Sequence, residues 1–222
     1  MDITKHRRAR MLVTLFVAGA FLTGTLAACG SDDDSSGGAP STAGNGIDRA
    51  FVADMIPHHE SAVEMANIAE DRGQSTFVTE LAGDIISSQT SEITKMRVIA
   101  SRLDDAGVKE KSLGVPEHQM GMDMDVSELK TAKPFDRAFI DMMIPHHQGA
   151  IRMARVELAE GSNPQAKQLA TQIIAAQAKE ITAMNKHRTA EFGGPSPAGG
   201  VPAEDAKEDD AMNDGTMGMD HG

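Results

Sequence analysis

A pair of histidines preceded by Met-Ile-Pro occurs twice in this chain of 222 residues. The pentapeptide MIPHH spans residues 55–59 and recurs at residues 143–147. Imidazole nitrogen binds copper in both of its common oxidation states, and thioether sulfur prefers Cu(I). The residue types therefore favour metal binding. Whether they can form one site depends on the elements that carry them.

The histidine pairs belong to an internal repeat. A shift of 88 positions places residues 48–97 on residues 136–185 without a gap, and 22 of the 50 aligned positions are identical. The match begins at DRAF, passes through MIPHH and continues to Ile-Ile-x-x-Gln-x-x-Glu-Ile. Agreement of this extent in one register indicates duplication, so each copy supplies the same kinds of side chain.

Each repeat predicts a helical hairpin. Apolar and small residues recur every three or four positions over about residues 48–71; Gly73 ends that helix, and Ser75 caps a second over about residues 76–104. In the second repeat Gly161 ends one helix, and Asn163-Pro164 begins the other. Two hairpins that each expose an apolar stripe bury it against each other. The predicted fold is all-α, an antiparallel four-helix bundle over residues 47–191, with repeats at 47–104 and 135–191.

Polar side chains interrupt the apolar stripes at matching places in the two repeats. The first histidine of each pair lies on the stripe of the first helix, and a glutamine and a glutamate lie on the stripe of the second. A buried amide or carboxylate without a partner costs several kcal/mol, so the imidazoles of His58 and His146, or a shared metal ion, should satisfy these groups. A polar network that only fixes helix register is the alternative. The positions are His58, His146, Gln89, Gln177, Glu92 and Glu180.

The second histidine of each pair lies one step around the helix, where it either turns inward or stays at the helix border. Methionines near the histidines act as core filler when taken singly, and as soft ligands when taken with the histidines. The predicted metal ligands are His58, His59, Met65, His146, His147 and Met153. The predicted orienting or additional ligands are Met55, Gln89, Glu92, Met96, Met143, Gln177, Glu180 and Met184.

Proline stands directly before each histidine pair. If Pro57 began a new helix, Ile56 would be its N-cap, which is a poor choice, and the apolar spacing upstream would have no explanation. We therefore expect each helix to continue through its proline and to bend there, because the proline removes one backbone hydrogen bond. The bend would help imidazoles from two helices approach one centre.

Two further segments are rich in methionine and histidine. One is the connector between the repeats, residues 105–134, and the other is the acidic tail, residues 192–222, which is expected to be disordered. Both lack residues suited to a core, so disordered acidic sequence explains their Asp and Gly but not their Met. They are expected to capture Cu(I) weakly and deliver it. The residues concerned are His118, Met120, Met122, Met124, Met217, Met219 and His221.

The N-terminal residues predict export and a lipid anchor. Residues 1–28 combine a basic start with a short apolar stretch, typical of a signal peptide, and Leu-Ala-Ala-Cys at 26–29 resembles a lipobox. Lipidation at Cys29, the only cysteine, would attach the protein to the cell membrane at its extracytoplasmic face, with residues 29–46 as lipidated end and flexible tether. The net charge of −12 argues against nucleic acid as a partner and favours cations.

The two copies of F-x-x-x-M-I-P-H-H-x-x-A-x-x-M-A, each followed by the Ile-Ile-x-x-Gln-x-x-Glu-Ile helix, resemble the bacterial family known as domain of unknown function 305. The resemblance covers nearly all of residues 47–190 in the two-copy form. It implies a ferritin-like bundle, a functional His-His motif and, in some members, copper binding. Ferritin-like di-iron sites use Glu-x-x-His, which is absent from the stripe positions here, so iron oxidation or storage does not follow.

The leading hypothesis is a non-enzymatic, envelope-anchored protein that sequesters or transfers copper outside the cytoplasm, with a copper donor or acceptor protein or a second copy of itself as partner. Another divalent metal is an alternative cargo. A metal-dependent oxidoreductase with a duplicated His/Glu site is a second hypothesis, and a helical interaction module without metal is a third.

Overall fold

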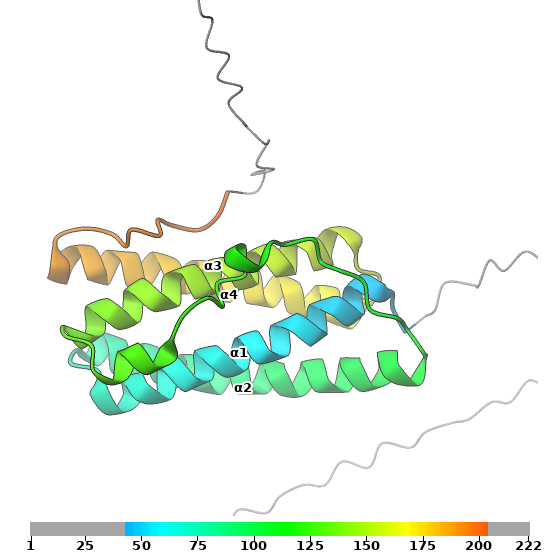
Figure 1. The fold of residues 1–222 in the computed structure, drawn as a ribbon, viewed down its shortest axis with the longest axis horizontal. Helices are drawn as coiled ribbons and strands as arrows, with labels where there is room; N and C mark the ends of the chain where they lie inside the picture. Colours follow the sequence, from blue (N-terminus) through cyan, green and yellow to red (C-terminus); the bar gives the residue numbers. More distant parts are fainter. Residues whose placement is uncertain (1–42, 204–222) are drawn as a thin grey trace, which may run out of the picture. The chain divides into compact units, whose positions relative to one another are not determined.

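The computed structural model describes residues 43–203, which contain four long helices. They are α1 (Gly46–Arg72), α2 (Thr76–Asp105), α3 (Phe135–Glu160) and α4 (Pro164–Phe192). Two short 3-10 helices, η1 (Glu117–Gln119) and η2 (Val126–Lys130), lie in the connector. Residues 43–203 contain no strand. The predicted all-α four-helix bundle is confirmed (Figure 1).

Several predictions concern residues that the structure does not describe. Residues 1–42 and 204–222 are outside it, and with them the signal peptide, most of the tether and most of the tail. Among residues 43–203, no helix is both long enough and apolar enough to cross a membrane. The undescribed candidate residues are Cys29, Met217, Met219 and His221.

Side-chain caps begin three of the helices. Asn45 accepts hydrogen bonds from two backbone N–H groups of the first turn of α1, at 2.8 and 3.2 Å. Ser75 caps α2 by accepting from Val78 N–H, as predicted, and Asn163 caps α4 ahead of Pro164. Such caps satisfy N–H groups that have no partner within the helix, and each contributes about 1 kcal/mol. The helix boundaries therefore follow from local sequence.

The aspartate of each DRAF segment ties the two repeats together. Asp48, at the start of α1, accepts from the backbone N–H groups of Ser162 and Asn163 between α3 and α4, at 3.0 and 2.8 Å. Asp136, at the start of α3, accepts from the N–H groups of residues 74 and 75 between α1 and α2, both at 2.8 Å. Each repeat thus binds the hairpin turn of the other, which fixes α1 beside α3.

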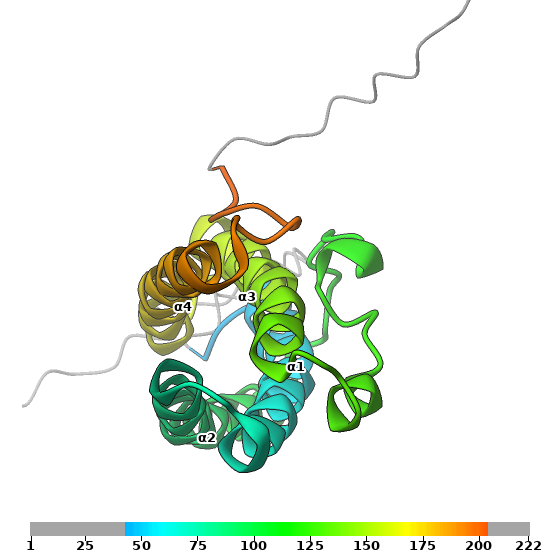
Figure 2. The ribbon, with the colours of Figure 1, turned by 90° about the vertical axis from the view of Figure 1, so that its left-hand side faces the viewer.

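Helices α1 and α3 form the face of the bundle that the connector crosses. Seen end-on, the four helices surround one interior, and the connector lies outside α1 and α3 (Figure 2). Both helices continue through their prolines, Pro57 and Pro145, as predicted. The histidine pairs therefore lie in the middle of two adjacent, uninterrupted helices.

The six helix methionines singled out in the sequence are all buried, with exposed fractions of 0 or 1%. Met55, Met96 and Met153 pack in one apolar cluster of the core. The other cluster contains Met65, Met143 and Met184. The duplicated positions thus pack in the two clusters in exchanged order, as a pseudo-twofold bundle requires.

The connector and the start of the tail differ from the expectation that they hold no core residues. Leu113 and Leu129 of the connector are buried, with exposed fractions of 5% and 0%. Residues 193–203, which we call the C-terminal strap, lie along α3 and α4 (Figure 1). The apolar patterning of these segments is too sparse to predict either anchorage.

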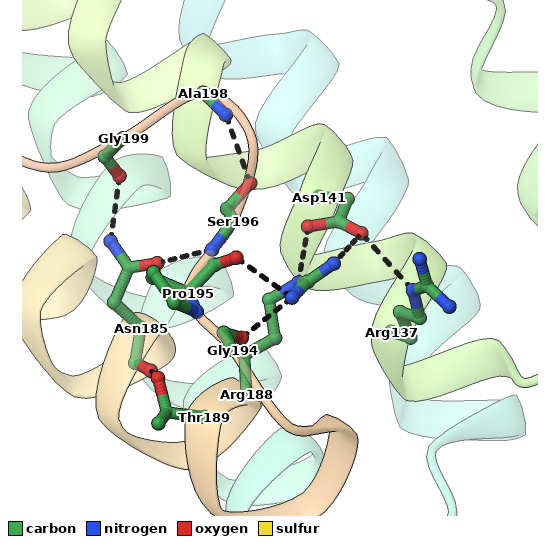
Figure 3. Close-up of polar contacts among 10 residues, drawn as sticks. All are labelled: Arg137, Asp141, Asn185, Arg188, Thr189, Gly194, Pro195, Ser196, Ala198 and Gly199. Carbon is green, nitrogen blue, oxygen red and sulfur yellow. Dashed lines mark hydrogen bonds and ion pairs between the residues drawn. The ribbon is translucent and has the colours of Figure 1, made fainter.

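Arg188 of α4 is the main anchor of the C-terminal strap. Its guanidinium pairs with Asp141 of α3 at 2.6 and 2.9 Å and donates to the carbonyl groups of Gly194 and Pro195, at 2.6 and 2.8 Å (Figure 3). Asn185 holds the strap further along, by accepting from one backbone N–H and donating to one carbonyl. These contacts use four of the five N–H groups of the buried guanidinium, so the strap is part of the folded unit.

Candidate metal centre

The first histidines of the two pairs meet at the α1–α3 contact. The rings of His58 and His146 have centroids 3.7 Å apart and are tilted by 38°. Neither side chain is exposed. The 88-residue repeat therefore does place the two motifs at the same level on facing helices, and the two imidazoles are in direct contact.

The second histidines of the pairs are also fully buried, and they bind the two stripe glutamates. His59 Nε2 lies 2.8 Å from Glu92 Oε2 on α2, and His147 Nε2 lies 2.6 Å from Glu180 Oε2 on α4. Sequence reasoning offered His58 and His146 as the partners of these carboxylates. That assignment was wrong by one residue, because one step along a helix turns a side chain by about 100°, from the partner helix towards the helix of the same hairpin.

Met120 of the connector supplies the partner of His58. Its backbone carbonyl oxygen lies 3.0 Å from His58 Nε2. Carbonyl oxygens and carboxylates only accept hydrogen bonds, so the Nε2 atoms of His58, His59 and His147 must carry the proton. In the neutral form of such a ring, Nδ1 then holds the free lone pair.

The free lone pairs are buried and have no hydrogen-bond partner. Among the described residues, Nδ1 of all four histidines is unpartnered, and so is Nε2 of His146. A buried polar atom left unpartnered costs about 1 to 3 kcal/mol. Metal-binding histidines typically donate their other ring N–H to a carboxylate or backbone carbonyl, and that is the arrangement in three of these rings.

Burial keeps the stacked imidazoles neutral. Desolvation, followed by the neighbouring imidazoles, lowers the pKa of His58 to about 3. Desolvation, followed by His58, lowers the pKa of His146 well below its ordinary value of 6.5. Neutral imidazole is the form that binds metals, so both rings are ready to act as ligands at neutral pH without losing a proton.

The stripe glutamines add further unsatisfied groups to the same level of the bundle. Gln89 and Gln177 have exposed fractions of 2%. The Oε1 atom of Gln89 and both amide atoms of Gln177 have no partner. The interior of the bundle thus contains more buried polar atoms than the hydrogen bonds among the described residues satisfy, which leaves room for a bound water or ion.

Histidines and carboxylates alone do not make a preformed metal site. Among residues 43–203, no group of three or more His, Cys, Asp or Glu side chains is arranged to hold a metal ion. The rings within each pair are 6.2 and 6.3 Å apart. Any ligand set must therefore include another kind of group, such as thioether sulfur or a glutamine oxygen, or the imidazoles must move when an ion binds.

The candidate residues of the connector lie partly against this centre and partly in solvent. Met120 and Met124 are half-buried, whereas His118 and Met122 are exposed. Met142 of α3, which sequence reasoning missed, lines a surface groove with Met124. The repeat gives no signal for Met142, because its counterpart in the first repeat is Asp54.

The comparisons with known proteins agree with the repeat and the fold. A family model described as "Domain of unknown function (DUF305)" matches residues 48–188. The chain belongs to the DUF305 family. The predicted family resemblance is therefore confirmed, and the DUF305 region contains both histidine pairs and all four long helices apart from a few terminal residues.

Solved structures similar to this DUF305 chain include CopM, determined in apo, Cu(I)-bound, Cu(II)-bound and Ag-bound forms. The Cu(I)-bound form is 32% identical, with a TM-score of 0.56, and the match covers 66% of this chain and 98% of CopM. A DUF305 protein from Streptomyces coelicolor, assigned as secreted, is 28% identical with a TM-score of 0.56, over 68% of this chain and 96% of that one.

A curated relative is the uncharacterized protein L153 of Acanthamoeba polyphaga mimivirus. It is 44% identical over 50 residues, which is 22% of this chain. The match spans only 33% of that protein, so it supports kinship of one segment and nothing about activity.

Proposed function

We propose that this protein binds copper, with Cu(I) as the preferred ion, at the centre of the bundle between α1 and α3. The observation that carries the proposal is the set of buried imidazoles whose Nε2–H groups are held while their Nδ1 lone pairs have no partner. The copper-bound and silver-bound forms of the similar protein CopM support it. Copper is the cargo in this proposal, and no catalysed reaction is part of it.

The proposed ligands are ring nitrogen and thioether sulfur. Nδ1 of His58, His59 and His147 binds the ion, and His146 binds through either nitrogen. Sulfur is the proposed complement, because thioethers prefer Cu(I) and, among residues 43–203, histidines and carboxylates alone form no metal group. Met65 and Met153 are the proposed sulfur ligands, with the other buried methionines as additional ones.

Glu92 and Glu180 orient the imidazoles rather than bind the ion. Each accepts from a buried Nε2–H, which fixes the tautomer and makes Nδ1 a stronger donor of electrons. Their side chains are 13% and 18% exposed, so the carboxylates keep some contact with water while their partners have none. This contact lowers the cost of holding two charges at the edge of an apolar interior.

The proposed setting is the extracytoplasmic face of the cell membrane, with a lipid on Cys29 as the anchor. The lipobox-like sequence and the secreted assignment of the similar Streptomyces coelicolor protein support it. There the protein sequesters copper or passes it to another protein. The net charge of −12 attracts cations to the protein and so favours the uptake of copper.

A competition titration tests the copper site. Protein beginning at residue 30 is titrated with Cu(I) against a chelator of known affinity, as parent and with all four paired histidines replaced by Ala. His187→Ala is the matched control, because His187 stacks on Phe77 at 4.3 Å and belongs to no pair. We expect loss of the tight site only in the fourfold variant. Unchanged Cu(I) affinity in that variant would show that the site is not in the core. If the parent bound Zn²⁺ as tightly as Cu(I), copper would not be the preferred ion.

A further inference from the structure

One stretch of the connector has fully buried anchors at its two ends only. Between them it is held by two polar contacts to its carbonyl groups, from His58 to Met120 and from Arg152 to Gln119, and by partly buried apolar side chains. Leu113 and Leu129 are buried, and none of the fifteen residues between them is. We call residues 114–128 the flap. It crosses the outer side of α1 and α3 with the short helix η1 near its middle (Figures 1 and 2). Segments with few buried apolar contacts open at low free-energy cost, while the packed helices beneath stay closed.

The flap covers the histidine centre through a backbone-to-backbone contact. The carbonyl oxygen of Met120 accepts from His58 Nε2 and lies against Gly149 of α3, where a Cβ atom would come within 1.8 Å of it. Gly121 has a φ of +73°, and a Cβ there would lie 2.5 Å from the carbonyl oxygen of Pro145. Both glycines are thus required for the flap to close on α3.

The internal repeat shows that Gly149 serves the flap rather than the helix. The counterpart of Gly149 in the first repeat is Ser61, a half-buried residue on α1. Glycine in a helix interior costs about 1 kcal/mol relative to alanine. Of the two aligned positions, the chain accepts this cost only in the copy that the flap contacts.

Soft ligands lie along the flap and beside it. Met120, Met122 and Met124 occur at every second position, and Met122 is 40% exposed. Met124 and Met142 line a groove of about 440 Å³ next to Pro145, the residue before His146. Thioether side chains therefore lie in solvent at Met122 and along the groove at Met124 and Met142, and Met120 contacts His58 through its backbone.

We propose that the flap is a second, outer site for a soft monovalent cation, bound by its methionine sulfurs, and that it lifts to pass the ion to His58 and His146. When it lifts, the Met120 carbonyl leaves His58 Nε2, and the imidazole pair becomes accessible. This inference rests on the proposed copper site as the receiver of the ion. The opening itself is a property of the metal-free chain.

The opening is tested without metal. Gly149→Ala places a methyl group on the Met120 carbonyl and should hold the flap open. Gly83→Ala on α2 is the matched control, because a Cβ there meets only a glutamate oxygen at 3.6 Å. The readouts are hydrogen exchange across residues 114–128 and the rate at which diethyl pyrocarbonate modifies His58 and His146.

We expect Gly149→Ala to raise the modification rate about 10- to 100-fold, as for a flap that is closed about 90 to 99% of the time. The control should match the parent. Equal protection in all three proteins would overturn the flap. If Gly149→Ala fails to fold, hydrogen exchange of the parent protein is the test. Flap amides that exchange as slowly as the interior amides of α1 and α3 would contradict the inference.

The outer site is tested with Ag(I), which is soft and redox-inert. Met120, Met122 and Met124 are replaced together by Leu, which keeps their apolar bulk and removes sulfur. Val126→Leu in the same flap is the control. The core is monitored by silver protection of the buried histidines from modification.

We expect the Leu triple variant to load the core about tenfold more slowly while its equilibrium affinity is unchanged, because the sulfurs raise the local concentration of the ion. An unchanged loading rate would refute the outer site. Failure of silver to reach the core in the parent and in every variant would instead refute the proposed function, and the metal-free result for the flap would stand by itself.

Discussion

The buried carboxyl of Glu157 should make the stability of this protein fall as pH rises. Glu157 lies in the last turn of α3, has no exposed surface, and neighbours Asp48, whose carboxylate binds the α3–α4 turn. Desolvation, followed by the hydrogen bond to Asp48, raises the pKa of Glu157 to about 9 from an ordinary value of 4.5. The folded protein therefore keeps this group protonated at neutral pH, whereas the unfolded chain ionises it.

The sign and the size of the effect follow from this difference. The protonated carboxyl contributes fully to the free energy of unfolding below pH 4.5, and this contribution is lost as pH rises through 9. At pH 7, proton uptake on folding costs about 3 kcal/mol, since each unit between the unfolded pKa and the pH costs about 1.4 kcal/mol. Glu157→Gln keeps the shape of the side chain but removes the ionisation, so it should stabilise the fold by about that amount at pH 7.

Urea unfolding at pH 5, 7 and 8.5 measures the effect. The gain from Glu157→Gln should be small at pH 5 and should grow at each step. Glu160→Gln, an exposed glutamate in the same helix turn, is the control and should leave the pH dependence as in the parent. The first repeat shows that the glutamate is dispensable, because its counterpart there is Ala69 and Asp136 still binds its turn. An equal pH slope in Glu157→Gln and parent would refute the reasoning.

Three further outcomes are expected. Replacing Glu92 and Glu180 together by Gln should lower copper affinity about 10- to 100-fold by releasing the imidazoles; equal affinities in competition titrations would make the carboxylates structural only. Arg188→Leu should cost about 2 to 4 kcal/mol, because two carbonyl groups lose a donor and Asp141 keeps only the more distant Arg137 as an ion-pair partner. Limited proteolysis should then cut the C-terminal strap, and unchanged melting and cleavage would contradict this. Cys29→Ser should move the protein from the membrane fraction to the soluble extracytoplasmic fraction, and continued membrane attachment would refute the lipid anchor.

The bundle and the level of its centre could be predicted because both rest on periodic signals. Caps such as Ser75 and Asn163, together with apolar spacing, define the helices, and the 88-residue repeat brings His58 and His146 to one level. The direct contact of their rings is a finding of the structure. The assignment of glutamates to histidines failed because the two histidines of a pair differ by one helix step. That step decides whether an imidazole points to the other helix of its own hairpin or to the facing hairpin.

The flap and the C-terminal strap could not be predicted, because neither has a hydrophobic period. The flap is fixed by a backbone carbonyl, and a carbonyl leaves no trace in residue types. A signal was nevertheless present in the alignment of the two repeats, in which Gly149 corresponds to Ser61. Differences between the copies, such as this one and Glu157 against Ala69, mark the places where the chain departs from its own symmetry.

The identity of the metal-binding nitrogen tests the central claim most directly. The imidazoles of protein labelled with ¹⁵N at histidine are observed by NMR while Ag(I) is added to one equivalent. The account predicts that the Nδ1 resonances of His59 and His147 shift, while their Nε2 atoms keep the protons donated to Glu92 and Glu180. Binding through Nε2 of these two histidines, or silver bound with no histidine resonance changed, would contradict it.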